Sequence, residues 1–160
     1  MKRYLAIDIG ASSGRHILGT VEDGKIKLEE VFRFDNSQIV KNGHVCWDLQ
    51  TLARNVLRGL KAAADAGTAP DYVGIDTWGV DFVLVNELGL LVGDAVAYRD
   101  ARTQGMMEVV DAVIPFRELY AHCGIQRVEF NTVYQLMALM REHPEQFTKA
   151  SRLLMIPDYL

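Results

Sequence analysis

The sequence predicts an α/β domain, and three observations lead to that class. Three apolar segments follow one another within residues 4–34 and are joined by short glycine-containing turns, which is the pattern of an antiparallel meander. Residues 49–60 then repeat their apolar side chains at intervals of three and four, as one face of a helix does. A further apolar segment at 72–76 leads back from that helix, and a helix returning to a sheet is typical of α/β proteins.

Three strands are expected in the meander, at residues 4–10, 15–22 and 25–34. A tight loop of small residues, 10–14, joins the first strand to the second. Asp23-Gly24 before the third strand is a strong hairpin signal. A loop is expected at 35–45, with Asn42-Gly43 as a turn within it.

The helix that follows has Asp48 as a suitable N-cap and Gly67 as a suitable stop. Beyond the strand at 72–76, more strand is expected between Asp81 and Arg99, with a turn near 87–89. Further helices are expected at 101–113, at 132–142 with Asn131 as its cap, and from Pro144 onward. The last apolar run stops abruptly at Leu160, as if the chain were cut where a new element begins.

Composition excludes several classes of function. A length of 160 residues fits one domain, or one domain with an elaboration. The net charge of −4 and the isoelectric point near 5.5 argue against a nucleic-acid partner or an anionic membrane, since both require a basic face. The sequence has no apolar run long enough to span a membrane and no signal peptide, which indicates a cytoplasmic protein. Its cysteines and histidines lack zinc or disulfide spacing, so we expect reduced thiols.

The first candidate for chemistry is the loop that follows the first strand. Consecutive main-chain amides and serine hydroxyls there offer several donors to one anion. Asp8 ends the strand before it, and such a carboxylate can hold Mg²⁺ through water. The loop lacks the Walker A pattern and joins two strands, so it is not a P-loop. A plain hairpin turn with an acidic flank explains the same residues.

The second candidate is the segment 74–82, at the end of the strand at 72–76, and the third is the segment 98–102. Around Trp78, carboxylates and amides can bond hydroxyls while an aromatic ring covers apolar C–H groups, which suits a carbohydrate. The alternative is that Trp78 and Phe82 belong to the core. In the segment 98–102, two arginines and Asp100 suit either a polar wall for a sugar or a surface ion-pair cluster, and Asp100 can equally cap a helix.

Five blocks, in order, resemble the FGGY carbohydrate kinase family: residues 6–15, 74–84, 97–103, 130–136 and 154–160. The resemblance implies a ribonuclease H-like fold of the actin and hexokinase type. It implies that residues 1–160 are an N-terminal kinase domain, with 1–78 as a βββαβ core and 79–160 as a sugar-side insertion with helices. It also implies ATP and Mg²⁺. The block around Trp78 is most similar to members that phosphorylate L-rhamnulose on its 1-hydroxyl in rhamnose catabolism.

The resemblance also implies roles for individual residues. The ATP phosphate-binding residues would be Ala11, Ser12, Ser13, Gly14 and Arg15. Asp8 would lie by the metal and the transferring phosphoryl group. Gly79 would present its backbone to the sugar, and the further wall residues would be Thr77, Trp78, Asp81, Tyr98 and Arg102.

The general base of the family is an aspartate in the second half of a much longer chain, where the adenine site also lies. No catalytic residue is therefore expected here, and the 160 residues alone are expected to be inactive. An open apolar edge is expected to lead to self-association. Two alternatives stay open: a kinase for a related deoxy-ketose such as fuculose, and a noncatalytic actin-like nucleotide-binding module.

Overall fold

The computed structural model describes residues 2–160, and the chain divides into two compact units. Unit 1 consists of Met1–Gln38, Asp48–Gly79 and Ile156–Leu160, and unit 2 of Ile39–Trp47 and Val80–Met155.

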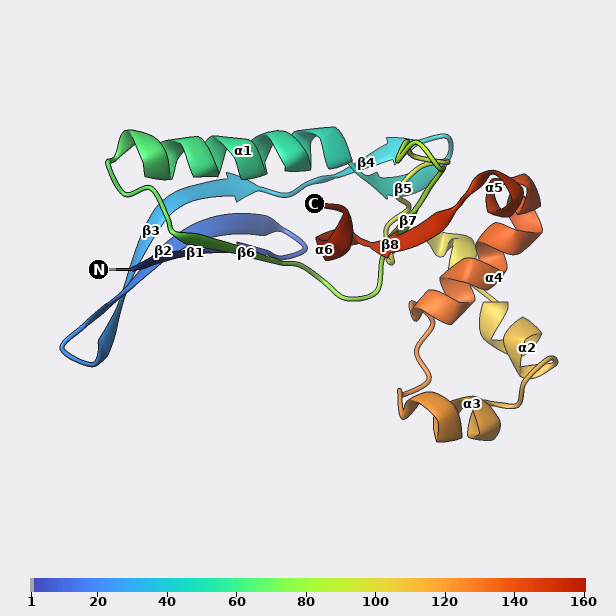
Figure 1. Ribbon diagram of the computed structural model, residues 1–160. Coiled ribbons are helices and arrows are strands. Elements are labelled where there is room, and N and C mark those ends of the chain that lie inside the picture. Colours follow the sequence, from blue (N-terminus) through green and yellow to red (C-terminus); the bar gives the residue numbers. More distant parts are fainter. Residues whose placement is uncertain (1) are drawn as a thin grey trace. The chain divides into compact units, whose positions relative to one another are not determined.

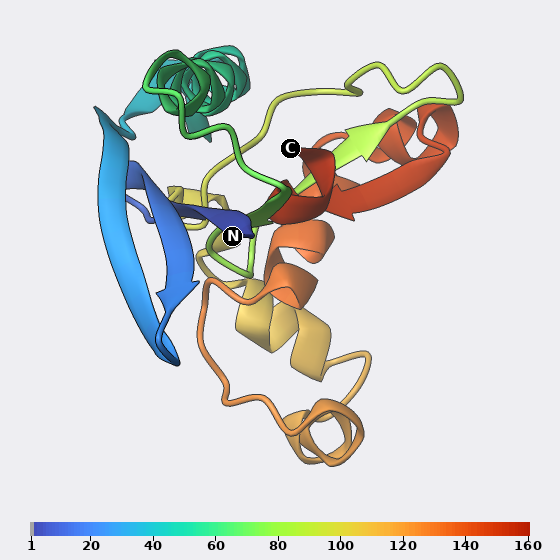
Figure 2. The ribbon, with the colours of Figure 1, turned by 60° about the vertical axis from the view of Figure 1, so that its left-hand side comes forward.

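Unit 1 is built on a four-stranded sheet with the strand order β3-β2-β1-β6 (Figure 1). The strands are β1 (Arg3–Ile9), β2 (Ser13–Glu22), β3 (Lys25–Asp35) and β6 (Tyr72–Asp76). β2 is antiparallel to both β1 and β3, whereas β6 is parallel to β1. The predicted meander and the returning strand are therefore confirmed. The β2–β3 hairpin turns at Asp23-Gly24 and projects beyond the other strands (Figure 2).

Helix α1 (Leu49–Asp65) packs against β2 and β3, as Figure 1 shows. Asp48 is its N-cap and accepts a hydrogen bond from the amide of Thr51 at 3.0 Å, as predicted. Gly67, in a left-handed conformation, follows the last turn, so both predicted helix ends are confirmed. Unit 1 is completed by α6 (Ile156–Tyr159), whose Ile156 is buried.

His16 on β2 is fully buried beneath α1. Its Nε2 lies 3.1 Å from the carbonyl oxygen of Val56, and its ring meets that of Phe32 edge-on. Gly59 on α1 makes this contact possible, because a Cβ at that position would overlap the imidazole ring. Burial lowers the pKa of His16 because it disfavours the charged imidazolium.

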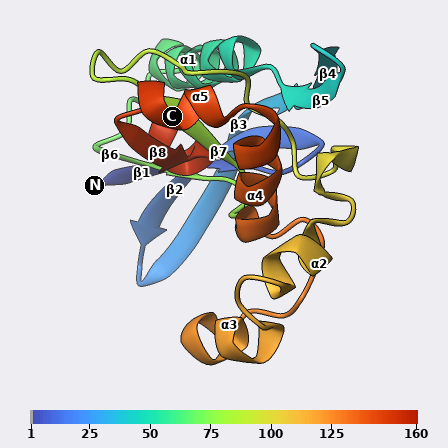
Figure 3. The same cartoon turned by 90° about the vertical axis from the view of Figure 1, so that its right-hand side faces the viewer.

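Unit 2 contains a short antiparallel pair and a group of helices. The strands are β7 (Phe82–Val85) and β8 (Arg152–Met155). The helices are η1 (Ala101–Thr103), α2 (Met106–Asp111), α3 (Phe116–Cys123), α4 (Thr132–Glu142) and α5 (Pro144–Lys149). Figure 3 shows α2 beside α4, with α3 farther from the strands. A core of Phe82, Leu84 and Leu139 joins β7 to α4.

Several predicted elements were wrong in part. The expected loop at 35–45 contains a hairpin of β4 (Gln38–Lys41) and β5 (His44–Trp47), turned at Asn42-Gly43. Between Asp81 and Arg99 only β7 is a regular strand, with isolated bridges beyond it. The expected helix at 101–113 is interrupted at Gly105, whose φ is +73°, and becomes η1 and α2.

The N-terminal end of α4 also differs from expectation. Asn131 occupies the N-cap position of α4, but its side chain donates to the carbonyl of Gln126 instead of capping the helix. α3 was not predicted, and none of its residues is buried. α4 itself and the start of α5 at Pro144 are confirmed.

Two further features concern the cysteines and the possibility of a membrane-spanning helix. Cys46 and Cys123 are free thiols. Among residues 2–160, no helix combines the length and the apolar character needed to cross a membrane.

The buried His16 predicts a pH dependence of stability. Its pKa in the folded state lies below the ordinary histidine value of 6.5, so the unfolded chain binds the proton more readily. The free energy of unfolding is therefore expected to fall as the pH drops below about 6.5. Urea unfolding at a series of pH values should show this loss, and H16Q should reduce it. The exposed His122 provides the control, and H122Q should leave the profile unchanged. Equal profiles for H16Q and the unmodified chain would contradict this account.

Candidate functional site

Three carbonyl groups at the turn between β1 and β2, those of Gly10, Ser12 and Ser13, accept hydrogen bonds within unit 1. The amide of Gly10 donates to the carbonyl of Ser13 at 2.8 Å. Asn36 donates twice, from its amide to the carbonyl of Ser12 at 3.0 Å and from Nδ2 to the carbonyl of Gly10 at 2.9 Å. Within residues 2–160, the amide of Ala11 has no main-chain acceptor. The loop can therefore offer this donor to an anion.

Where this loop enters β2, the main chain at Gly14 packs closely against the ring of Phe34. A Cβ at that position would overlap the ring of Phe34 on β3, which is buried. Glycine is therefore required here by the approach of the aromatic ring.

Asp8 lies at the end of β1 and forms an ion pair with Arg15 on β2. Both Nη2 and Nε of Arg15 approach Oδ2 of Asp8, at 2.8 and 2.9 Å, and each side chain is 46% exposed. The pair is thus accessible to a ligand, and an exposed pair of this kind is easily rearranged.

Asp76 lies in the second candidate segment, but no role beside Asp8 was predicted for it. In the parallel pairing of β6 with β1 it is the register partner of Asp8, so the two carboxylates lie side by side on one face. Its signal was in the sequence, because Asp76 ends its strand just as Asp8 does. Residues 77–79 then leave the sheet at the edge where the β1–β2 loop lies.

The predicted sugar-contacting residues of this segment have different surroundings. Thr77 donates through Oγ1 to the carbonyl of Trp78 at 3.2 Å. At Gly79 a Cβ would meet nothing within 4 Å, so its backbone is open to approach. These residues therefore begin at the same sheet edge as Asp8 and the loop.

The face of the sheet opposite α1 is open. A hollow of about 870 Å³ lies over it, with Asp8 and Asp76 at one end. Its apolar lining includes Tyr4 and Tyr72, whose rings stack at 5.2 Å, together with the largely exposed Ile26 and Leu28. This surface, here called the open sheet face, is mostly apolar.

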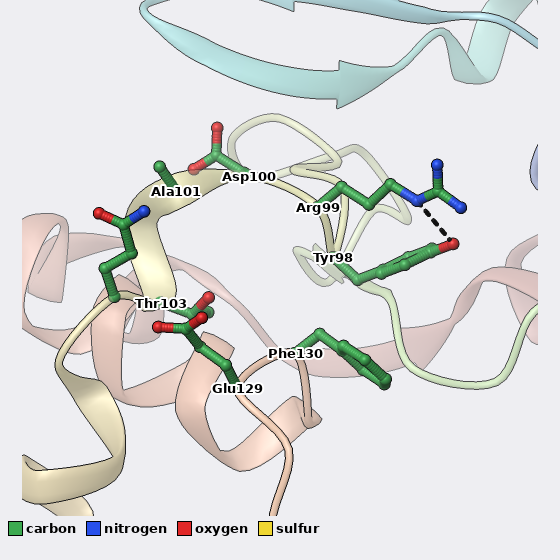
Figure 4. Close-up of a pocket in the computed structure, with 8 residues that line it drawn as sticks. Tyr98, Arg99, Asp100, Ala101, Thr103, Glu129 and Phe130 are labelled. Carbon is green, nitrogen blue, oxygen red and sulfur yellow. Dashed lines mark hydrogen bonds between the residues drawn. The ribbon is translucent and has the colours of Figure 1, made fainter.

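Unit 2 contains a separate hollow of about 600 Å³, shown in Figure 4. Its lining residues are Tyr98, Arg99, Asp100, Ala101, Thr103, Gln104, Glu129 and Phe130. The rings of Tyr98 and Phe130 meet edge to face at 5.6 Å, and Arg99 Nε donates to the hydroxyl of Tyr98 at 3.1 Å. This combination of aromatic faces and a carboxylate suits a polyhydroxylated ligand. Glu129 and Phe130 were not predicted as site residues.

Asp81 was predicted as a wall residue, but its side chain is fully buried. Its Oδ2 accepts hydrogen bonds from Trp47 Nε1 at 2.5 Å and from the amide of Tyr98 at 3.1 Å. Its Oδ1 accepts from Gln135 Nε2 at 3.0 Å. The carboxylate is therefore directed into unit 2, where it fixes the main chain at Tyr98 instead of facing a ligand.

Arg102 likewise lies behind the hollow and not in its lining. Its Nη2 donates to Oε1 of Gln135 at 2.9 Å, and Gln135 Nε2 donates to the carbonyl of Phe130 at 2.9 Å. Burial lowers the pKa of Arg102, and the charges of Asp100 and Asp81 oppose this effect. The buried polar network of Asp81, Gln135 and Arg102 thus supports both aromatic residues of the hollow.

Asp100 fills the predicted role of a helix cap and also contacts His44. Its Oδ1 accepts from the amide of Arg102 at 2.9 Å, which confirms it as the cap of η1. The same oxygen lies 3.0 Å from Nδ1 of His44. Burial raises the pKa of Asp100, but hydrogen bonds from Val45, His44 and Arg102 outweigh it and leave the pKa lowered.

Comparison with known proteins agrees with this geometry. Residues 3–160 match the FGGY family of carbohydrate kinases, N-terminal domain. A protein named rhamnulokinase from Oceanobacillus iheyensis is 53% identical over 156 residues, which are 98% of this chain and 33% of that protein. Another rhamnulokinase, from Halalkalibacterium halodurans, is 51% identical over 99% of this chain and 34% of its own. The chain therefore spans about a third of the length of these relatives.

Solved structures support the same fold. Gluconate kinase from Lactobacillus acidophilus matches with a TM-score of 0.83 at 14% identity, over 99% of this chain and 32% of its own. Xylulose kinase from Rhodospirillum rubrum matches with a TM-score of 0.82 at 17% identity, over 99% and 33%. These matches confirm the predicted ribonuclease H-like fold. The match along residues 3–160 shows that the chain belongs to the FGGY family of carbohydrate kinases.

Proposed function

We propose that this chain is the N-terminal part of an ATP-dependent kinase that phosphorylates L-rhamnulose to L-rhamnulose 1-phosphate. The observation that carries the proposal is the meeting of the β1–β2 loop, Asp8 and Asp76 at one edge of the sheet. The identity to relatives named rhamnulokinase supports the choice of sugar. Residues 1–78 act as the core of the domain and 79–160 supply the sugar side.

In this proposal the β1–β2 loop binds the phosphates of ATP. The amide of Ala11 and the hydroxyls of Ser12 and Ser13 donate to phosphate oxygens, and Gly14 lets the chain pass beneath them over Phe34. Arg15 is held beside the loop by Asp8. Its guanidinium can turn from the carboxylate to a phosphate, which exchanges one charge-assisted hydrogen bond for another.

The donor chemistry at the sheet edge fits Mg²⁺. This ion prefers oxygen ligands and is usually held by one or two carboxylates together with water and substrate phosphates. Asp8 and Asp76 supply two such carboxylates on neighbouring strands. Residues 2–160 contain no cluster of three or more metal-binding side chains, so the remaining ligands would be water and phosphate. When bound, Mg²⁺ neutralises charge on the phosphates during transfer.

The hollow of unit 2 contributes to binding the sugar. Tyr98 and Phe130 cover apolar C–H groups, and Glu129 accepts hydrogen bonds from hydroxyls. Thr77, Trp78 and Gly79 of unit 1 stay proposed as sugar-contacting residues in their own right. Asp81 and Arg102 act from behind the hollow by holding its aromatic residues in place.

The general base is proposed to lie in the part of the protein that this chain does not include. Positioned acid–base catalysis contributes a factor of about 10² to 10⁴ in rate, so the 160 residues alone are expected to have no measurable activity. The partners are ATP and a small sugar, with no nucleic acid and no membrane, and the place of action is the cytoplasm.

The decisive test is the full-length protein with a panel of ketoses, in which L-rhamnulose should give the highest kcat/KM and L-fuculose a lower one. Preference for L-fuculose would overturn the choice of sugar.

The role of Arg15 predicts a selective defect in ATP binding. In the full-length protein, R15A should raise the KM for ATP about tenfold, because a charge-assisted hydrogen bond to phosphate is lost. The KM for the sugar should stay unchanged. The matched control is K61A, which removes an exposed cation paired with Asp65 on α1. Steady-state kinetics with each substrate varied in turn measures both values, and an unaltered KM for ATP in R15A would contradict the role.

The hollow of unit 2 predicts a defect in sugar binding that leaves ATP binding unchanged. F130A should raise the KM for L-rhamnulose about tenfold through loss of the aromatic contact, with the KM for ATP unchanged. F116A is the control, since Phe116 pairs with Tyr120 on α3 and does not line the hollow. An effect on ATP alone would assign Phe130 to another role.

The open sheet face predicts self-association of the 160-residue chain. Ile26 is 72% exposed and Leu28 is 70% exposed on this face, and a second copy can bury both. Sedimentation velocity should show dimers or larger species that L28K converts to monomers. L88K is the control, because Leu88 is 82% exposed but lies in the turn that follows β7 in unit 2. A monomer at all concentrations would exclude self-association.

A further inference from the structure

Asn36 immediately follows β3 and is almost completely buried, with 8% of its surface exposed. It is not part of the β1–β2 loop, but two of its donors reach that loop. Its amide donates to the carbonyl of Ser12, and its side-chain Nδ2 donates to the carbonyl of Gly10. Asn36 thus holds two peptide groups of the loop through their carbonyl oxygens.

The side-chain bond determines where the amide of Ala11 points. A trans peptide group is planar, so its N–H and its C=O point in opposite directions. The carbonyl of Gly10 and the amide of Ala11 belong to the same peptide group. Because Asn36 holds that carbonyl on its own side, the amide of Ala11 must point away from Asn36, where it finds no main-chain acceptor within residues 2–160.

Without this bond the peptide group can turn over. Glycine permits backbone conformations that other residues resist, so Gly10 places little restriction on the rotation. A turned peptide would present the carbonyl of Gly10, a partial negative charge, where a phosphate has to bind. The side chain of Asn36 prevents this without touching the anion.

We propose that Asn36 is a positioning residue that holds the β1–β2 loop in its anion-binding conformation. This inference rests on the proposed role of the loop in binding ATP. It assigns a function to a residue outside the loop that no local pattern marks, and it concerns nucleotide phosphates, whichever sugar is phosphorylated.

The variants separate the two bonds of Asn36. N36A keeps the main-chain bond to Ser12 and removes only the side-chain donor. N36D puts an oxygen against the carbonyl of Gly10 and adds a negative charge near the phosphates. N36S retains a shorter donor and should give an intermediate effect. The matched control is N86A, because Asn86 also fixes a turn with its side chain, accepting from the amides of Leu88 and Leu90 in unit 2.

The test follows the amide signals of the 160-residue chain by ¹H–¹⁵N NMR during titration with inorganic triphosphate and Mg²⁺. In the unmodified chain and in N86A, the signals of Ala11 and Ser12 should shift. The apparent Kd for triphosphate should rise about tenfold in N36A and further in N36D. Signals elsewhere report whether each variant is folded. In the full-length protein, N36A should raise the KM for ATP and leave the KM for the sugar unchanged.

The outcomes separate this inference from the proposed function. If the loop signals shift in the unmodified chain and N36A binds triphosphate equally well, the role of Asn36 is wrong and the loop remains the phosphate site. If no loop signal shifts in the unmodified chain, the phosphate-binding role of the loop is wrong and the inference falls with it. A variant that does not fold is replaced by N36S, for which unchanged affinity and KM would also overturn the proposal.

Discussion

The parallel pairing of β6 with β1 is the constraint on which the candidate phosphate site depends. It aligns Asp76 with Asp8, and the antiparallel pairing of β2 places Arg15 next to Asp8 in the same row. The β1–β2 loop leaves this row at the edge where residues 77–79 also leave the sheet. A shift of one residue in this register would turn the side chains of β6 to the other face. Helix α1 brings the chain back to this register, and the buried fit of His16 against it fixes where α1 lies.

In unit 2, buried charged side chains hold the aromatic residues of the hollow in place. A buried carboxylate is costly unless its oxygens are hydrogen-bonded, and Asp81 accepts three hydrogen bonds. Through these bonds and those of Gln135, the main chain is held at both Tyr98 and Phe130. Arg102 extends the network as a buried cation. The polar residues of this region thus act mainly on the shape of the hollow.

The sequence was sufficient for elements that depend on local patterns. The meander, α1 with its cap at Asp48, and the returning strand all follow from periodicity and turn residues within short windows. Residues whose roles come from register or packing could not be found in this way. The sequence places Asp76 at the end of a strand, but its alignment with Asp8 comes only from the pairing of β6 with β1. Asn36 reaches the loop only because β3 pairs with β2 and ends beside it. Asp81 was misassigned because residue type alone does not distinguish an exposed carboxylate from one with three buried donors.

The central claim is that the metal and the phosphates of ATP bind at the edge of the sheet of unit 1. Paramagnetic broadening by Mn²⁺ with triphosphate tests it most directly, since the effect falls steeply with distance from the ion. The account predicts the strongest broadening at the amide signals of Asp8, Ala11 and Asp76, and little at Gly24, at the opposite end of β2. Broadening centred on the hollow of unit 2, or none that requires triphosphate, would contradict it.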